Sequence, residues 1–361
     1  MQKLFIGVDL HKTQFTCYFL SAKGDGISKK FATNTVGYTN FIQNIQQAKE
    51  AGFDVLVAVE STGNTRYFKK LMDDRNIPVT VVNTMKFKVV NESVNKTDKR
   101  DAKTIAEFLS KDMLPESRLC SEESEQLKRL IKTRKILVDS RVQLKNQVHG
   151  ILLGMGINSK RGQLNSKKGR AAILESISDK IQKEVVRVVI DSIETIESQV
   201  KKVEKQLDNM TENDRVVEIL KTISGTGSII AITVRAHIDD IQRFKNYRKL
   251  SSFCGLVPWV QCSNETNHYG HITKRGSREL RTAVIQMVLG MIRCKKEKDN
   301  RLMQQYRFLK KQKGSGKALV AIARKFTRII WTLLMNDNEY DSEKLKHGSD
   351  FIDNFELNKA S

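Results

Sequence analysis

The first 110 or so residues alternate short apolar runs with stretches of helical periodicity. The run at 54–59 is almost purely apolar, which is typical of a strand buried on both faces of a sheet. Strands are expected at 3–8, 15–20, 54–59 and 79–82, and helices at 40–51 and 96–110. This order of elements predicts an α/β domain.

From about residue 122 the spacing changes to a seven-residue repeat. Leu130, Leu137, Leu144 and Ile151 lie seven residues apart, and a second apolar series over 189–210 advances by alternating steps of four and three. A segment rich in Gly and Lys separates the two series. The pattern predicts a coiled-coil hairpin of two long helices, packed against each other or against another subunit, because heptads do not identify the partner.

The remaining chain, to about residue 335, reads as mostly helical. Pro115 stands where the α/β pattern gives way to the heptads, so we place a boundary there. We expect four segments, namely an α/β domain at 1–115, the long helical region at 116–215, a mostly α domain at 216–335 and an acidic tail at 336–361.

The charge balance indicates a polyanionic partner. Lys and Arg number 63 against 41 Asp and Glu, which gives a net charge of +22 and favours nucleic acid. The tail alone carries −4, and we expect it to be weakly ordered and solvated. Five cysteines without a close pair are typical of a reducing compartment, and neither a signal peptide nor a membrane span is evident. We therefore expect a cytoplasmic protein.

Four carboxylates occupy positions that suit a metal site. Asp9 and Glu60 end two predicted strands, while Asp98 and Asp101 share the head of the apolar face of the last predicted helix. Each alone suits a helix-terminal acid or a structural ion pair. Together they predict a site for two Mg²⁺ ions, with Mn²⁺ as the alternative, about 4 Å apart around a phosphodiester.

The order of these acids resembles that of the ribonuclease H-like nucleases, in particular the branch of the Holliday-junction resolvases. The resemblance rests on Gly7–Asp9, on Val59–Gly63 (VESTG) and on Lys96–Ala102 (KTDKRDA). It implies a RuvC-like fold for 1–115, with Asp9, Glu60, Asp98 and Asp101 as metal ligands.

Further along, Ile223–Ile229 places a Gly-x-Gly between two helical stretches. This resembles a helix-hairpin-helix element, in which the amides of Gly225 and Gly227 would receive a DNA phosphate. An ordinary tight turn is the alternative.

Three strings carry a second, more specific resemblance: Phe253–Pro258 (FCGLVP), Gln261–Asn264 (QCSN) and Gly270–Arg281 (GHITKRGSRELR). They resemble the C-terminal domain of a family of bacterial insertion-sequence transposases, the bridge-RNA-guided recombinases, which join a four-carboxylate domain to this serine domain. The resemblance covers nearly the whole chain. The nucleophilic serine of the family falls on Ser263, although Asn264 stands where the family usually has Gly. Asn also tolerates a left-handed backbone.

The resemblance implies a transposase that forms a covalent phosphoserine–DNA link. It also implies a structured guide RNA and a homo-oligomer, a dimer or tetramer, in which the serine of one subunit meets the carboxylates of another. Beside the serine, phosphate contacts are expected from four cations, the alternative being solvated helix charges: Lys274, Arg275, Arg278 and Arg281.

Two other readings stay open. A resolvase-like, structure-selective nuclease would use water as its nucleophile, and Ser263 would then be structural. A nucleic-acid-binding protein without catalysis is the third reading, and the complete carboxylate set disfavours it. No nucleotide cofactor is expected, because Gly314–Lys317 lacks the first Gly of a phosphate-binding loop at Lys311.

Overall fold

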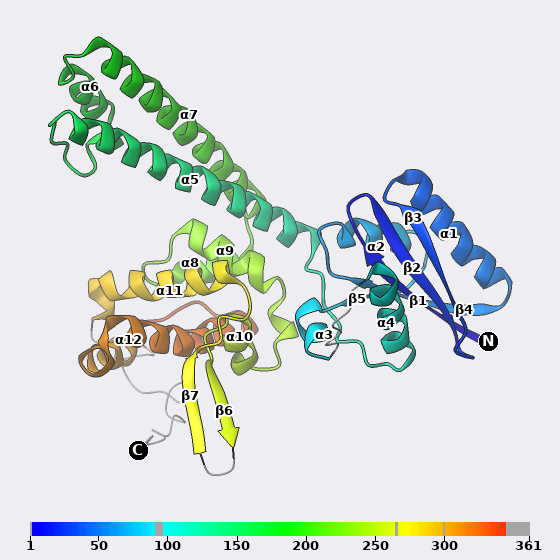
Figure 1. Ribbon diagram of the computed structural model, residues 1–361. Coiled ribbons are helices and arrows are strands. Elements are labelled where there is room, and N and C mark those ends of the chain that lie inside the picture. Colours follow the sequence, from blue (N-terminus) through cyan, green and yellow to red (C-terminus); the bar gives the residue numbers. More distant parts are fainter. Residues whose placement is uncertain (1, 91–96, 264–265, 299, 344–361) are drawn as a thin grey trace. The chain divides into compact units, whose positions relative to one another are not determined.

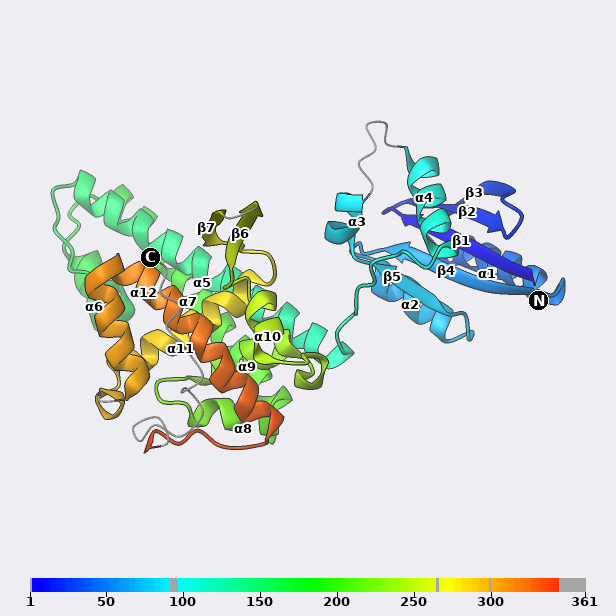
Figure 2. The same ribbon diagram turned by 90° about the horizontal axis from the view of Figure 1, so that it is seen from below.

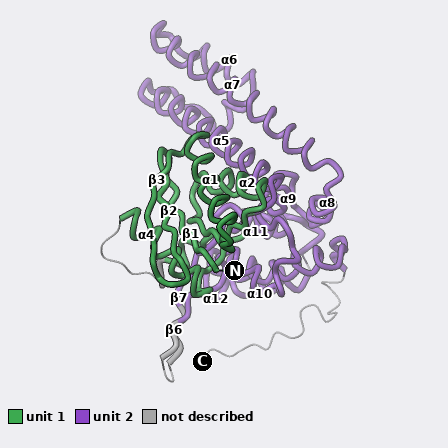
Figure 3. The backbone as a smooth tube through the Cα atoms, turned by 90° about the vertical axis from the view of Figure 1, so that its right-hand side faces the viewer, with its two compact units in different colours: residues 1–119 green, residues 120–361 purple. Residues whose placement is uncertain are grey.

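A computed structural model describes residues 2–90, 97–263, 266–298 and 300–343, without the side chains of 88–90 and 261–269. The chain forms two compact units, residues 1–119 and 120–361 (Figure 3). Each unit is described by itself. Among the described residues, no helix is long and apolar enough to cross a membrane.

Unit 1 is built on a mixed five-stranded sheet with strand order β3-β2-β1-β4-β5 (Figure 1). β2 pairs antiparallel with both β1 and β3, whereas β1, β4 and β5 are parallel. The strands are β1 Gln2–Leu10, β2 Gln14–Ser21, β3 Gly26–Ala32, β4 Phe53–Glu60 and β5 Val79–Val82. The α/β fold expected for this region is confirmed.

Helices cover both faces of this sheet. On one face Phe15 packs with Phe41 of α1 (Thr35–Glu50) and Phe68 of α2 (Thr65–Asp73). On the other face Phe5 and Tyr18 pack against Ala102 of α4 (Asp98–Ser110). Because successive strand side chains alternate between faces, each strand serves both cores. A short helix, α3 (Thr84–Val90), follows β5.

Three elements of unit 1 were not anticipated from the pattern, namely β3, α2 and α3. β3 lies at the edge of the sheet and carries the exposed Lys29 and Lys30, so it lacks the apolar run that marks a central strand. Charged edge strands are common because they discourage pairing with other chains. α2 and α3 have nine and seven residues, too few for a clear periodicity.

Unit 2 begins with a long helical hairpin. α5 (Glu122–Gly154) packs against α7 (Lys180–Met210), and the short α6 (Lys167–Glu175) lies between them in the chain (Figure 1). At the base, Leu127 and Leu207 join the large core of the unit. At the tip, Leu152 and Val186 belong to a separate small core.

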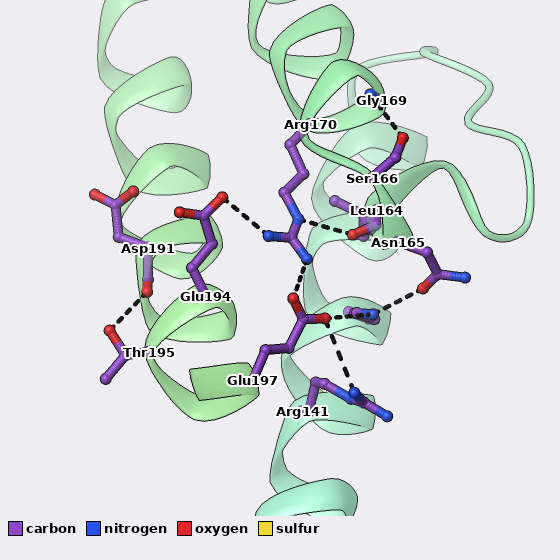
Figure 4. Close-up of polar contacts among 11 residues, drawn as sticks. Arg141, Leu164, Asn165, Ser166, Gly169, Arg170, Asp191, Glu194, Thr195 and Glu197 are labelled. Carbon is purple, nitrogen blue, oxygen red and sulfur yellow. Dashed lines mark hydrogen bonds and ion pairs between the residues drawn. The ribbon is translucent and has the colours of Figure 1, made fainter. Parts of the chain in front are cut away.

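A buried arginine ties the tip of this hairpin together (Figure 4). Arg170 of α6 donates to the main-chain oxygen of Leu164 at 2.8 Å and to Oε1 of Glu194 at 2.9 Å. It also pairs with Glu197, to which Lys145 of α5 donates at 3.2 Å. These ion pairs lower the pKa of Glu197, although its partial burial opposes them. One side chain thus links α6, α7 and the loop before α6, and Glu197 extends the link to α5.

The rest of unit 2 is mostly helical, as expected. Its core contains Ile232, Met287 and Phe326, contributed by α9, α11 and α12. The helices are α8 Arg215–Thr222, α9 Ser228–Ile238, α10 Tyr247–Phe253, α11 Arg278–Arg293 and α12 Arg301–Met335. Single 3-10 turns lie at Gln163–Asn165, Ile241–Arg243 and Lys295–Glu297. Gly314 breaks α12 into two arms, with φ at 78° and ψ at 164°.

One β-hairpin interrupts the helices of unit 2 and was not predicted. β6 (Pro258–Ser263) pairs antiparallel with β7 (Thr266–Ile272). Both strands are rich in polar residues and do not alternate, so the sequence carries no period-two signal there.

The start of the acidic tail is held on unit 2. Arg215 pairs with Asp337 at 3.1 Å and with Glu339 at 3.0 Å, and the Tyr340 hydroxyl donates to Glu297 at 2.9 Å. These contacts hold the first tail residues, yet the side chains of Asp337 and Glu339 are still 71% and 60% exposed, so the expectation of a solvated tail stays a prediction. Residues 344–361 lie outside the described part of the chain.

Candidate functional site

The strand register brings Asp9 and Glu60 side by side. β1 and β4 are parallel and pair Gly7 with Ala58 and Val8 with Val59, so one step further Asp9 lies beside Glu60. Successive strand side chains alternate between the two faces of the sheet. Phe5 of β1 and Ala58 of β4 face α4, so Asp9 and Glu60, four and two residues further on, face α4 as well. The two acids therefore sit on the same face, at the carboxyl end of adjacent strands.

The first turn of α4 supplies the other two acids. Thr97 caps this helix, since its hydroxyl accepts from the Arg100 amide, and Asp98 and Asp101 follow in the first turn. Gly7 allows α4 to lie directly on β1, because a Cβ at this position would meet the Ala102 carbonyl oxygen at 2.1 Å. The close approach brings the head of α4 to the strand end that carries Asp9.

The electrostatics of Asp9 are consistent with four neighbouring acids. The pKa of Asp9 is raised from 3.8 to about 6, mainly by burial; His11 lowers it, and the charges of Asp98, Asp101 and Glu60 raise it. Asp9 is 4% exposed. A buried carboxylate among three others is costly without a cation.

His11 is a neighbour that the sequence reasoning missed. Its Nε2 lies 3.1 Å from Oδ2 of Asp9 and 3.5 Å from Oδ1 of Asp98. Ligand atoms of these three residues all lie within 4.8 Å of one another, which would suit a metal ion. The signal in the sequence was the position of His11 two residues beyond Asp9, at the end of the same strand.

The donor set fits a divalent cation that prefers oxygen. Carboxylate oxygens are the ligands that Mg²⁺ and Mn²⁺ favour, and the pKa of Asp9 is raised mainly by its burial. Asp9, Glu60, Asp98 and Asp101 could hold such an ion, and His11 could add a nitrogen ligand. These residues come from β1, β4, α4 and the turn after β1.

A pocket of about 580 Å³ lies at the ends of β1 and β4, and the described residues that line it include His11 but none of the four acids. Its lining includes His11, Lys12, Thr62, Asn64 and Tyr67. The VESTG string forms the turn from β4 into α2, in which the Thr65 hydroxyl donates to the Glu60 carbonyl at 2.7 Å. The side-chain amide of Asn64 donates from Nδ2 to the His11 carbonyl at 3.1 Å. The turns after β1 and β4 are therefore tied together around the pocket.

In unit 2, two of the strings singled out in the sequence meet at the root of the β6–β7 hairpin. The Thr273 amide donates to the Val257 carbonyl at 2.9 Å. Gly276 has φ at 112°, and a Cβ there would meet the Phe253 oxygen at 2.0 Å, so only glycine fits. Arg281 Nη1 donates to the carbonyls of Cys254 and Lys274 at 3.1 and 3.3 Å.

The four cations predicted to bind phosphate lie on this root and on the start of α11. Lys274, Arg275 and Arg278 are exposed, whereas Arg281 is half-buried. Ser263 ends β6, and its backbone pairs with Thr266 across the hairpin. Its side chain, and Asn264 next to it, lie outside the described residues.

The Gly-x-Gly turn joins α8 to α9, as the helix-hairpin-helix reading requires. Gly225 has φ at 81° and lies against Gly290 of α11, so closely that a Cβ on Gly225 would meet the Gly290 carbonyl carbon at 2.4 Å. Next to it, the Ser224 hydroxyl donates to the buried Glu297 at 2.5 Å. Gly227 precedes α9 and is exposed.

A second serine with a basic neighbour was also missed. Ser277 Oγ lies 3.0 Å from Nδ1 of His237, and burial lowers the pKa of that imidazole to about 4. The same hydroxyl accepts from the Leu280 amide and so caps α11. Since a cap already employs this oxygen, we assign Ser277 a structural role.

Comparison with known proteins agrees with these features. Residues 6–157 match the DEDD-type transposase model of IS110 elements, and residues 217–304 match the model described as "Transposase IS116/IS110/IS902 family". The chain thus carries the transposase domains of the IS110/IS116 family, one match covering most of unit 1 and the start of unit 2, and the other lying within unit 2.

Similar proteins span nearly the full length. The "Transposase for insertion sequence element IS1111A" of Coxiella burnetii is 27% identical over 93% of this chain and 90% of its own. The "Probable family 20 transposase" of Pseudomonas aeruginosa is 26% identical over 79% and 85%. The "Pilin gene-inverting protein" of Moraxella bovis is 24% identical over 94% and 98%.

Proposed function

We propose that this protein is an insertion-sequence transposase that cuts and rejoins DNA at a carboxylate site in unit 1, with Ser263 as its nucleophile. The observation that carries the first part is the placement of Asp9 and Glu60 on adjacent parallel strands beside the head of α4. The same placement supports a RuvC-like, ribonuclease H-like assignment for the sheet.

The four acids would hold two Mg²⁺ ions, or Mn²⁺ in their place. A divalent ion bound there would neutralise the charge that builds up on the phosphate during strand cleavage. Asp9 is buried at the end of β1, and its Oδ2 lies 3.1 Å from Nε2 of His11. Asp98 and Asp101 are positioned by the Thr97 cap rather than by a flexible loop.

Ser263 would attack the phosphorus of a phosphodiester. Its hydroxyl loses the proton, a bond forms between Oγ and phosphorus, and the bond from phosphorus to a deoxyribose oxygen breaks, with that oxygen taking up a proton. The phosphoserine link conserves the bond energy. A sugar hydroxyl of a second strand then attacks the phosphorus, re-forms a phosphodiester and releases the serine.

Backbone and cationic groups in unit 2 would position the DNA. Lys274, Arg275 and Arg278 are exposed beside the root of the β6–β7 hairpin, whose far end carries Ser263, and we extend the same role to Arg281. The amides of Gly225 and Gly227 lead into α9, whose N-terminus favours a phosphate.

A guide RNA and self-assembly complete the proposal. The resemblance to bridge-RNA-guided recombinases suggests a structured RNA, and a net charge of +22 would accommodate RNA and DNA together. Assembly is supported by an apolar stripe on the outside of α7, where Ile181, Val185 and Val188 are 75%, 41% and 58% exposed. Their spacing of four and three places them on one face.

A covalent-adduct assay tests the proposal. The purified protein is incubated with Mg²⁺, RNA from the flanking element and end-labelled donor DNA, and a denaturing gel is used to detect protein-linked label. An adduct is expected from the wild type and from Ser252→Ala, an exposed serine of α10. None is expected from Ser263→Ala, from Asp9→Asn or in EDTA.

The alternatives give different gels. Free cleaved ends without an adduct, still formed by Ser263→Ala, would identify a nuclease that uses water. An adduct that persists in Ser263→Ala would overturn the assignment of the nucleophile, and an adduct that forms without RNA would overturn RNA guidance.

A further inference from the structure

A basic pocket in unit 2 contains none of the proposed catalytic residues in its described lining. It has a volume of about 420 Å³ and is lined by α10 and by both arms of α12. The arms lie side by side, since Lys325 on the second donates to Gln305 on the first at 2.6 Å. α10 packs against α12 (Figure 2).

Four cations converge on this pocket: Arg248, Arg324, Lys325 and Arg328. The described residues that line it include no carboxylate. Burial lowers the pKa of Lys325, and the charges of Arg301 and Arg324 lower it further, so the positive charges repel one another there. Such a concentration of charge favours an anionic ligand.

An aromatic ring lies among these cations. The Arg328 guanidinium is 5.4 Å from the centre of the Tyr247 ring and that of Arg248 is 6.0 Å from it, both within range of cation–π attraction. Leu302, Val257 and Ile329 add apolar surface to the lining. The pocket therefore offers a flat ring and an apolar wall together with cations.

This combination selects the ligand. A free phosphate would leave the apolar wall unused, and a duplex keeps its bases stacked inside, away from such a wall. An unpaired nucleotide satisfies both parts, because its base can stack on an aromatic ring while its phosphate meets Arg or Lys. A volume of about 420 Å³ lies in the range of pockets for small organic ligands.

We propose that the pocket between α10 and α12 binds one unpaired nucleotide of a nucleic-acid strand, with the base against Tyr247 and the phosphate held by Arg328 and Arg324. Val257, at the pocket wall, directly precedes β6, and Ser263 ends that strand about 20 Å from Val257. The pocket would thus grip a strand a short distance from the proposed nucleophile. Nucleotide binding in this pocket does not require Ser263 to be the nucleophile, so the two proposals can be tested separately.

Binding of short oligonucleotides to the full-length protein tests it. Fluorescence anisotropy gives Kd for a fluorescein-labelled 12-mer of deoxythymidine, for the matching 12-mer of uridine and for a 12-base-pair duplex. Tyr247→Leu and Arg328→Gln are expected to weaken single-strand binding by tenfold or more, while duplex binding changes by less than twofold. Tyr247→Phe, which keeps the ring, should bind as the wild type does.

Two control variants lie on α12, outside the pocket lining. Phe308→Ala removes an aromatic side chain that is 59% exposed, and Lys310→Gln removes an exposed cation. Neither should change single-strand binding by more than twofold. If the pocket variants lose affinity for both the DNA and the RNA 12-mer, the site does not distinguish the two sugars. If they lose affinity for only one 12-mer, that nucleic acid is the ligand.

Crosslinking provides a readout that does not depend on variants. Oligonucleotides with one 4-thio-substituted base are irradiated on the wild-type protein, and the attached peptides are mapped. Adducts in 247–257 or 321–329 are expected. Adducts confined to other segments, or single-strand Kd values of the pocket variants within twofold of the controls, would overturn the proposal.

Discussion

His11 Nε2 lies 3.1 Å from Oδ2 of Asp9 and 3.5 Å from Oδ1 of Asp98, so one imidazole contacts two of the four acids. The contact favours the ionised form of Asp9, whereas burial and the neighbouring carboxylates favour the neutral form. Burial and the neighbouring carboxylates outweigh His11, so the pKa of Asp9 is raised to about 6. A carboxylate in this state gains more than an exposed one from a divalent cation.

Replacement of Asp9 should therefore stabilise the metal-free protein. The folded chain binds the Asp9 proton more tightly than the unfolded chain, so its stability falls as pH rises from about 4 through about 6. At pH 7.5 in EDTA, Asp9→Asn is expected to raise the free energy of unfolding by up to about 3 kcal/mol. Urea denaturation measures this.

Two comparisons make this test specific. The gain should largely vanish at about pH 3, below the ordinary pKa of 3.8, where wild-type Asp9 is mostly protonated in both states. Asp25→Asn, which replaces an exposed carboxylate in the same unit, should have no comparable effect. Equal or lower stability of Asp9→Asn at pH 7.5 would contradict the origin that we give for the raised pKa.

Gly7→Ala should damage the acidic site without altering any acid. The new Cβ would meet the Ala102 oxygen at 2.1 Å and the Ala106 nitrogen at 2.5 Å, so α4 must move away from β1 with Asp98 and Asp101. We expect a loss of roughly 2 kcal/mol in stability and at least tenfold in Mn²⁺ affinity. Calorimetry measures both. Gly63→Ala is the control, because a Cβ there meets open space.

Gly290→Ala should disturb the Gly-x-Gly turn from a distance of 65 residues in the chain. Its Cβ would meet the Gly225 oxygen at 2.3 Å. Overpacking of this kind costs about 1–3 kcal/mol, so we expect a lower Tm together with weaker duplex binding. Gly150→Ala, in open space on α5, should keep or raise Tm. An unchanged Tm for Gly290→Ala would mean that the two backbones separate without cost.

A charge on the outer face of α7 should weaken self-assembly. Val188 is 58% exposed, and Val188→Glu places a carboxylate in the apolar stripe without touching the core of the hairpin. Light scattering after gel filtration is expected to show a smaller species, or dissociation at tenfold higher concentration. Gln206→Glu adds the same charge at an exposed position on α7 and should leave the assembly intact. An unchanged mass for Val188→Glu would exclude this stripe from the interface.

Arg170→Ala should loosen the tip of the long hairpin. The change leaves Glu194 and Glu197 without their buried partner and frees the Leu164 carbonyl. Losing hydrogen bonds to charged groups costs about 1.5–3 kcal/mol each, so hydrogen exchange should accelerate at least tenfold over 163–175. Arg187→Ala breaks an exposed pair with Glu184 and should leave exchange there unchanged. Equal protection in both variants would show that the apolar contacts suffice.

The sequence indicated the acids because each sits where periodicity is clear. Asp9 and Glu60 end apolar runs that pair as adjacent strands, and Asp98 and Asp101 begin an amphipathic helix. Local pattern was enough to place all four near one another. It could not reveal His11, because a histidine after a strand has many ordinary roles and its contact with Asp98 depends on how α4 packs.

Other features depend on tertiary packing rather than on local pattern. The contact of Gly225 with Gly290 and the pocket between α10 and the arms of α12 join segments far apart in the chain. The heptads predicted two long helices, yet polar pairs also join these helices, such as Arg134 with Glu204 at 2.7 Å near the base of the hairpin. Apolar spacing does not register contacts of that kind.

The hairpin closed by Arg170 is also a lever. From Ile131, in the large core of unit 2, to Leu152, in the tip core, α5 spans roughly 30 Å. Because both ends are locked, a rotation of about 10° at the base would carry the tip through roughly 5 Å. A small rearrangement of the core around α8 and α9 would in this way become a displacement of several ångströms at α6.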